Sequence, residues 1–236
     1  MQNKGVFIAV LNQGWIRPEL SSMMTELPRQ GKYDVYISYP AWKPITNNRN
    51  KIVKKFLESG MDYLLMIDSD NVPPFEVLDL ADYEKDIVGV VCFGYLKKMV
   101  IPFCLKKNTR GAYDVADFDE GDGLKEVDAV GTGCIMISRK VLQDVGYPFR
   151  NEYKPDGTKK MGLDINFCRR AQEKGYKIYC QTDYLCSHWT TMDLKKSWQT
   201  YQELKREILR LKDEQKSKNK KTAKQGSRTG RERSVK

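Results

Sequence analysis

The feature that most constrains this chain is a short apolar run that ends at two carboxylates. Tyr63 to Ile67 is apolar and rich in aromatic and branched side chains, and Asp68 and Asp70 follow it directly. Such a run predicts a strand buried on both faces, as inside an α/β sheet. Residues i and i+2 of a strand point to the same side. We therefore expect both carboxylates to point into the crevice at the carboxyl end of the sheet, where open α/β folds bind ligands.

Two carboxylates held this close repel each other unless a cation lies between them. Hard divalent ions with oxygen ligands, Mn²⁺ or Mg²⁺, suit such a pair. The alternative is a simple polar turn, because Asp and Asn favour turns. The apolar strand immediately before Asp68 favours a functional site over that alternative.

The same region carries a resemblance to a known family. Asn48-Arg49-Asn50, a helix-like run, and then the segment from Tyr63 to Asp70 resemble the sugar-nucleotide-binding half of a GT-A glycosyltransferase, close to glycosyltransferase family 2. The resemblance spans roughly residues 5–190 and is strongest here and over 127–188. It implies a GT-A, Rossmann-like α/β fold, with a mixed, mostly parallel central sheet flanked by helices. It also implies a divalent cation, Mn²⁺ or Mg²⁺, and a nucleotide-diphosphate sugar such as a UDP-sugar.

Length and hydropathy favour a single large domain with extensions. A chain of 236 residues can bury a substantial core. No apolar run approaches the roughly 20 residues of a membrane span, and Val6 to Leu11 is too short for a signal peptide. We therefore expect a cytoplasmic protein that is not an integral membrane protein. The six cysteines form no C-x-x-C pair, which favours buried free thiols over disulfides or zinc.

Charge and apolar periodicity together divide the chain into three segments. We expect a GT-A domain over 1–194 and, over 195–214, an amphipathic helix whose apolar residues recur at three and four positions. Residues 215–236 contain nine Lys or Arg and one Glu, almost without apolar side chains. That composition predicts a disordered basic tail, with weak contact to a polyanion or an anionic membrane as its expected partner interaction.

Several residues are predicted to contact the nucleotide. A strand from Gly5 to Leu11, a turn and a helix opening at Pro18 form a first βα unit; in its turn Trp15 either stacks on a base or packs under the helix. Arg49, early in the next helix, is exposed or contacts the pyrophosphate at a helix N-terminus. The glycines of Gly131-Thr132-Gly133 allow close backbone approach to a ligand. The predicted nucleotide-sugar contacts are Asn12, Trp15, Arg49, Asp68, Ser69, Gly131 and Gly133.

Asp164 and His188 complete the predicted site. Asp164 either caps a helix or corresponds to the catalytic base that the resemblance implies. In the family pattern a Glu precedes that Asp, whereas Leu163 stands here, so the stereochemical outcome stays open. His188 is the one histidine of the chain and follows the last predicted sheet strand. Imidazole is an acceptable manganese ligand, and the predicted metal ligands are Asp68, Asp70 and His188.

The function predicted from these residues is transfer of a sugar from a nucleotide donor to an acceptor hydroxyl. Asp70 and His188 are expected to be direct ligands, and Asp68 to hold the ribose or a metal-bound water. The acceptor stays open among a glycan, a small molecule, a protein and a DNA base. One alternative is a nucleotidyltransferase, although Asn12-Gln13-Gly14-Trp15 contains a single Gly after the first strand. The other is a non-catalytic nucleic-acid-binding protein, although residues 1–214 are nearly neutral.

Overall fold

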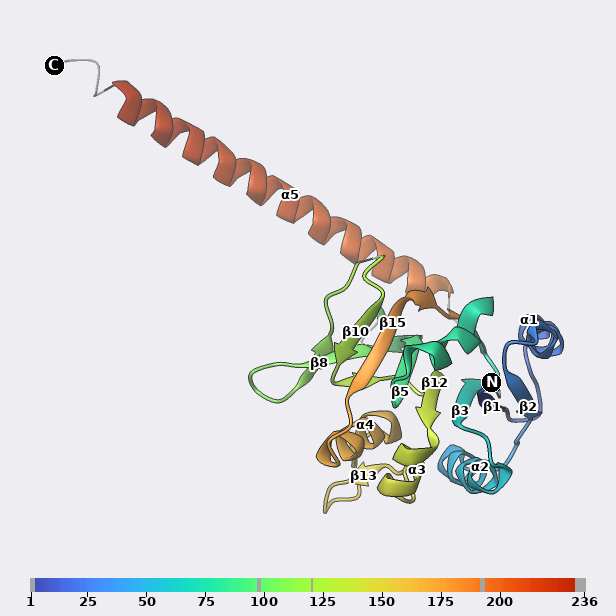
Figure 1. The fold of residues 1–236 in the computed structure, drawn as a ribbon. Coiled ribbons are helices and arrows are strands. Elements are labelled where there is room, and N and C mark those ends of the chain that lie inside the picture. The colour runs from blue at the N-terminus through green and yellow to red at the C-terminus, as the bar shows by residue number, and fades with distance from the viewer. Residues whose placement is uncertain (1–2, 97–98, 120, 192–193, 232–236) are drawn as a thin grey trace. The chain divides into compact units, whose positions relative to one another are not determined.

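The computed structural model describes residues 3–96, 99–119, 121–191 and 194–231. The chain divides into two compact units. The first is an α/β domain formed by the described residues up to 96 and from 100 to 190, and the second centres on the C-terminal helix α5 (Figure 1).

A seven-stranded sheet forms the centre of the α/β domain, in the order β10-β15-β5-β12-β3-β1-β2. β1 pairs in parallel with both β2 and β3, and β5 pairs in parallel with β15. β12 runs antiparallel to both β3 and β5, and β10 runs antiparallel to β15. Five of the seven strands therefore run in one direction. The strands are β1 (Gly5–Leu11), β2 (Asp34–Ser38), β3 (Tyr63–Asp68), β5 (Ile87–Val91), β10 (Leu124–Val127), β12 (Cys134–Ser138) and β15 (Ile178–Leu185).

Helices cover both faces of this sheet, which explains why its central strands read as continuous apolar runs. On one face, buried residues such as Phe56 of α2, Leu142 of α3 and Phe167 of α4 pack against the strands. On the other face, Leu20 of α1 and Val77 of η2 do so. The helices are α1 (Pro18–Glu26), α2 (Ile45–Ser59), α3 (Arg139–Val145), α4 (Leu163–Glu173) and the 3₁₀ segments η1 (Leu27–Gln30) and η2 (Phe75–Tyr83).

The remaining short strands form small sheets separate from the central one. They form the pairs β4–β16, β6–β7 and β13–β14 and the three-stranded order β11-β8-β9. Their bounds are β4 (Asn71–Val72), β6 (Phe93–Leu96), β7 (Met99–Pro102), β8 (Cys104–Lys107), β9 (Tyr113–Val115), β11 (Ala129–Val130), β13 (Glu152–Tyr153), β14 (Lys159–Met161) and β16 (Ser187–His188).

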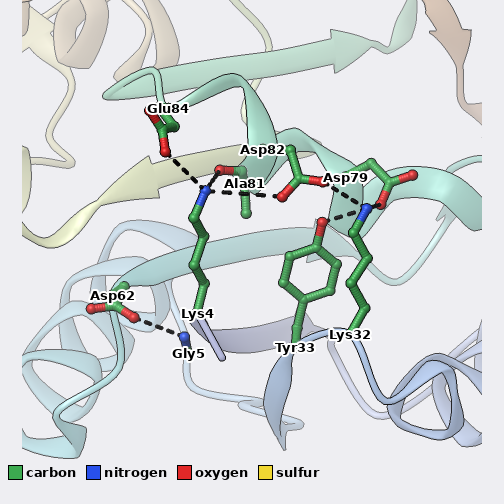
Figure 2. Close-up of polar contacts among 9 residues, drawn as sticks. All are labelled: Lys4, Gly5, Lys32, Tyr33, Asp62, Asp79, Ala81, Asp82 and Glu84. Carbon is green, nitrogen blue, oxygen red and sulfur yellow. Dashed lines mark hydrogen bonds and ion pairs between the residues drawn. The ribbon is translucent and has the colours of Figure 1, made fainter. Parts of the chain in front are cut away.

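A polar network joins the amino end of the sheet to η2 (Figure 2). Lys32 Nζ lies 2.6 Å from both Asp79 Oδ1 and Asp82 Oδ2, and the Tyr33 hydroxyl donates to Asp79 at 3.1 Å. The hydrogen bond from Lys32 lowers the pKa of Asp82. Lys4, just before β1, donates to the carbonyl of Ala81 at 3.0 Å. These contacts hold the amino end of the sheet, which is opposite the carboxyl end at which Asp68 lies.

The fold predicted from the sequence is confirmed: an α/β domain with a mostly parallel central sheet flanked by helices, followed by a C-terminal helix. One difference concerns α5, which runs without a break from Leu194 to Arg231. It therefore extends over residues 215–231, where a disordered tail was expected, since Lys, Arg, Gln and Ala are strong helix formers. Residues 232–236 lie outside the described part, and the functional division at 214 stays a prediction. No helix in the described ranges has the length and apolarity to cross a bilayer.

Candidate functional site

The candidate site lies where β3 ends and the chain turns into the short strand β4. Asp68 is the last residue of β3, and Asn71 begins β4 two residues after the turn at Ser69. β4 pairs with β16, and Asn71 lies opposite His188 in that antiparallel pair. The Trp189 amide also donates to the Asp70 carbonyl at 2.9 Å. This pairing brings His188, 118 positions later in the chain than Asp70, to the end of β3.

Asp70 and His188 face each other across this strand pair. His188 Nε2 lies 3.5 Å from Asp70 Oδ2, and the Asn71 amide donates to Asp70 Oδ1 at 2.9 Å. The other ring nitrogen, Nδ1, is hydrogen-bonded to the Phe93 carbonyl, which can only accept. In the neutral ring, Nδ1 therefore carries the proton and Nε2 turns a lone pair toward a carboxylate. Two electron-pair donors in this position are stabilised by a cation between them.

The Asp68 carboxylate is held by the guanidinium group of Arg49. One guanidinium nitrogen of Arg49 lies 2.8 and 2.9 Å from the two carboxylate oxygens of Asp68, and another donates to the Thr132 carbonyl at 3.0 Å. The Arg49 side chain is only 3% exposed. Burial raises the pKa of Asp68, Arg49 opposes that rise, and the neighbouring charges of Asp164 and Asp70 add to it. The site thus gathers more negative charge than Arg49 neutralises.

Asp164 belongs to the first turn of α4 but does not cap it. The N-cap position is Gly162, with no side-chain cap hydrogen bond. Asp164 Oδ1 instead accepts a hydrogen bond from the Thr132 hydroxyl, and Thr132 is 1% exposed. The helix-cap alternative for Asp164 is therefore wrong, because the side chain turns away from its own backbone toward β11–β12. A carboxylate in the first turn is still favoured by the helix dipole.

These side chains line one pocket of about 250 Å³. It collects six of the predicted site residues from four separate parts of the chain. Another hollow, of about 570 Å³ between α2 and α3, is lined by none of them. The residues that line the smaller pocket are Asp68, Asp70, Asn71, Cys92, Phe93, Gly94, Phe103, Gly131, Thr132, Gly133, Asp164 and His188.

Two of the three glycines that line this pocket, Gly131 and Gly133, allow protein segments to approach closely. A Cβ atom at Gly133 would lie 3.2 Å from Cys92 Sγ and 3.3 Å from Asn71 Nδ2. One at Gly131 would lie 3.1 Å from the Cβ of Phe103. Gly133 also accepts the Asp68 amide proton through its carbonyl, at 2.8 Å. Their small size therefore keeps the floor of the pocket close to Asp68 and Asn71.

Four predicted nucleotide contacts do not line the pocket. Asn12 is buried, with its side-chain amide donating to the carbonyls of Val10 and Pro40. Ser69 is buried, and its amide donates to the Leu11 carbonyl. Trp15 is 53% exposed, so it does not pack under the first helix. Arg49 is buried rather than exposed, because its guanidinium group pairs with the Asp68 carboxylate.

The donor set fits a divalent cation only in part. In the described ranges, no group of three or more His, Cys, Asp or Glu side chains is placed to hold a metal ion. Asp68 is directed to Arg49, so the pair that fits is Asp70 with His188. Histidines that bind metals almost always donate their second ring N–H to a carboxylate, carbonyl or water, and His188 has that arrangement with Phe93.

Sequence reasoning missed three groups of this site. They are the Asn71 side chain, the Thr132 hydroxyl and the Phe93 carbonyl, which hold Asp70, Asp164 and His188 respectively. The position of Asn71 directly after Asp70 was a usable signal. The other two depend on contacts between segments distant in the sequence, and no local pattern marks them.

Comparisons with known proteins bear on the fold. No protein-family model and no curated protein matches this sequence. Among solved structures, the chain is similar to the crystal structure of A197 from STIV, with 19% identity, a TM-score of 0.54 and coverage of 79% of this chain and 86% of that one.

Two further similar structures are more distant. GalNAc-T7 with UDP, GalNAc and Mn²⁺ has 9% identity and a TM-score of 0.48, covering 82% of this chain and 45% of that one. UDP-glucose pyrophosphorylase complexed with UDP-glucose has 12% identity and a TM-score of 0.39, covering 84% and 81%. Of these three, A197 alone has a TM-score above 0.5, and its likeness to this chain shows a shared fold.

Proposed function

We propose that this chain is a metal-dependent glycosyltransferase that moves a sugar from a nucleotide-diphosphate donor to an acceptor hydroxyl. The observation that carries the proposal is the facing pair of Asp70 Oδ2 and His188 Nε2, 3.5 Å apart. The Phe93 carbonyl holds the histidine in the tautomer that a metal ligand needs. A carboxylate oxygen and a neutral imidazole suit Mn²⁺ or Mg²⁺, with Mn²⁺ the better match for nitrogen.

A divalent cation in such a site supplies Lewis-acid neutralisation of the departing diphosphate. The protein's own residues do the rest. Asn71 fixes the Asp70 carboxylate through the 2.9 Å hydrogen bond to Oδ1, so that Oδ2 stays directed to His188. Asp68, held by Arg49, contacts the donor ribose or a water rather than the cation itself. Arg49 accordingly acts by positioning Asp68. The Arg49 guanidinium group can contact the pyrophosphate directly only after its ion pair with Asp68 opens.

Asp164 is the group we assign to the acceptor. Its Oδ1 accepts the Thr132 hydroxyl proton, and its Oδ2 is the atom that receives the acceptor proton if the reaction inverts the anomeric configuration. If the reaction retains configuration, the same carboxylate orients the acceptor or the sugar. Trp15, half-exposed, is the side chain we assign to stack on a nucleotide base. Of the other proposed donor contacts, Gly131 and Gly133 line the pocket. Asn12 and Ser69 are buried and hold the neighbouring backbone by hydrogen bonds.

A nucleotidyltransferase is the alternative with a similar crevice. The loop after β1 carries one glycine, Gly14, at a φ of 109°, whereas a phosphate-cradling loop needs several glycines and a basic residue. The products distinguish the two reactions. Glycosyl transfer releases a nucleoside diphosphate, and nucleotidyl transfer releases or consumes pyrophosphate.

The test is incubation of the full chain with a panel of UDP- and GDP-sugars and Mn²⁺, with products read by mass spectrometry. We expect nucleoside diphosphate release that EDTA abolishes, in wild type and in the matched control Glu58→Ala, an exposed carboxylate on α2. Asp70→Ala and His188→Ala should each remove it. Formation of UTP or GTP together with a sugar 1-phosphate, when pyrophosphate is added, would favour nucleotidyl transfer. No turnover of any donor with Mn²⁺ would favour a binding protein.

A further inference from the structure

The whole net charge of this chain lies in its C-terminal segment. Residues 194–236 contain fifteen Lys or Arg and five Asp or Glu, a net of +10, which equals the net charge of the entire protein. Residues 1–193 therefore carry 26 basic and 26 acidic side chains. A neutral α/β domain with a strongly basic extension indicates that the extension has an anionic partner of its own.

The first half of α5 also carries a broad apolar face. At about 100° per residue, the large apolar side chains of residues 194–211 fall within an arc of about 160°. All of them are exposed, Trp198 by 61% and Ile208 by 52%, and the Trp198 and Tyr201 rings stack with centroids 5.5 Å apart. The members of this apolar face are Leu194, Trp198, Tyr201, Leu204, Ile208, Leu209 and Leu211.

The remaining surface of residues 194–212 is polar and mostly basic. It combines four cationic side chains with two acidic ones, Glu203 and Glu207. Lys205 and Lys212 fall within the apolar arc, where long lysine stems can lie along apolar surface while the ammonium group reaches water. The four cationic side chains are those of Lys195, Lys196, Arg206 and Arg210.

We infer that α5 binds the surface of an anionic lipid bilayer, with the apolar face of residues 194–211 buried at the headgroup boundary. A clear separation of apolar from charged side chains, low overall hydropathy, basic flanks and a Trp–Tyr pair characterise helices that lie in that interface. The basic residues that follow, over 215–236, add electrostatic attraction to anionic headgroups. Because no helix in the described ranges could cross a bilayer, the interaction is at the surface.

Two other partners, nucleic acid and a second copy of this chain, would use only part of this surface. Nucleic acid would neutralise the basic charge but leave the apolar face in water. A second copy in a parallel coiled coil would use a heptad seam with Ser197 at one core position, and would leave Trp198 and Leu209 outside it. It would also place two strongly basic segments side by side. An anionic bilayer uses both the apolar face and the charge.

Vesicle flotation of the full chain tests this inference independently of sugar transfer. The vesicles are phosphatidylcholine alone or phosphatidylcholine mixed with phosphatidylglycerol. Ile208→Glu places one negative charge in the middle of the apolar face, and Gln199→Glu places the same charge on the polar face. Both positions are exposed, so circular dichroism should report a wild-type fold for each variant.

The wild type should bind the anionic vesicles at least about tenfold more tightly than the neutral ones. Ile208→Glu should weaken that binding by about tenfold or more, and Gln199→Glu by no more than about threefold. The inference is overturned if the full chain does not bind anionic vesicles at physiological salt, or if both variants lose affinity equally, since contact would then be purely electrostatic. It is also overturned if sedimentation shows a dimer that depends on Ile208 while vesicles bind nothing.

Discussion

Replacing Arg49 by methionine should destabilise the protein because it leaves the Asp68 carboxylate without its partner. The Arg49 side chain is 3% exposed and that of Asp68 is 29% exposed. Removing one member of a buried ion pair costs about 3–5 kcal/mol, and the partial exposure of Asp68 lowers this to about 2–3 kcal/mol. The Thr132 carbonyl also loses its donor, at a cost of about 1 kcal/mol. The expected total is about 3–4 kcal/mol.

A double-mutant cycle isolates the pair. In Arg49→Met/Asp68→Asn the unpaired charge is gone, so we expect about 1–2 kcal/mol of the loss to be recovered relative to the sum of the single changes. The control is Arg139→Met with Asp68→Asn. Arg139 donates to the carbonyls of Phe56, Leu57 and Met61, so this pair of changes should be additive.

Urea denaturation followed by circular dichroism measures both quantities, with m-values compared between variants to confirm a common transition. A cost below about 1 kcal/mol for Arg49→Met would refute the reasoning, because surface pairs contribute no more than that. A coupling energy equal to that of the Arg139 control would do the same.

Four further outcomes are expected. Asp164→Asn should lower turnover by on the order of 100-fold without changing donor affinity; wild-type turnover would return Asp164 to a structural role. Burial raises the pKa of Cys168 to about 12, and all six cysteines are buried free thiols, so a thiol reagent at pH 8 should label them only after unfolding. The Lys32 hydrogen bond lowers the pKa of Asp82, so this pair stabilises the protein above the ordinary carboxyl pKa of about 3.9 and ceases to do so as pH falls through the lowered value. The stability difference between wild type and Asp82→Asn, about 0.5 kcal/mol at neutral pH, should therefore vanish in acid; a difference that persists would contradict the assignment. Truncation after Glu214 should keep donor hydrolysis and metal dependence while removing most salt-sensitive binding to anionic vesicles; loss of hydrolysis would place the segment in the active site.

The elements of the sheet were predictable because burial on both faces leaves a local signal. The run from Tyr63 to Ile67 reads as a buried strand, and the structure has β3 over Tyr63–Asp68. The convergence of Asp68 and Asp70 on one pocket follows from their spacing at its end. The inclusion of His188 in the same pocket was expected from family resemblance, since nothing local predicts the pairing of β4 with β16.

Long-range polar pairing was not predictable from the sequence. Arg49 reads as an exposed residue or a ligand contact on a polar helix face, because charged side chains are seldom buried. Its burial depends on Asp68, 19 positions later. The Thr132–Asp164 hydrogen bond similarly joins two segments that local patterns treat separately. The lysine-rich composition after residue 214 is compatible with both a solvated coil and a helix, so the extension of α5 to Arg231 was not predictable from it.

Calorimetry of nucleotide binding tests the central claim most directly. With Mn²⁺, wild type should bind UDP or GDP at least about tenfold more tightly than in EDTA, corresponding to about 1.4 kcal/mol of coupling between metal and nucleotide. In Asp70→Ala and in His188→Ala this metal-linked increment should disappear while the fold is retained, and Glu58→Ala should keep it. Full metal-linked binding in both site variants would show that Asp70 and His188 do not hold the cation.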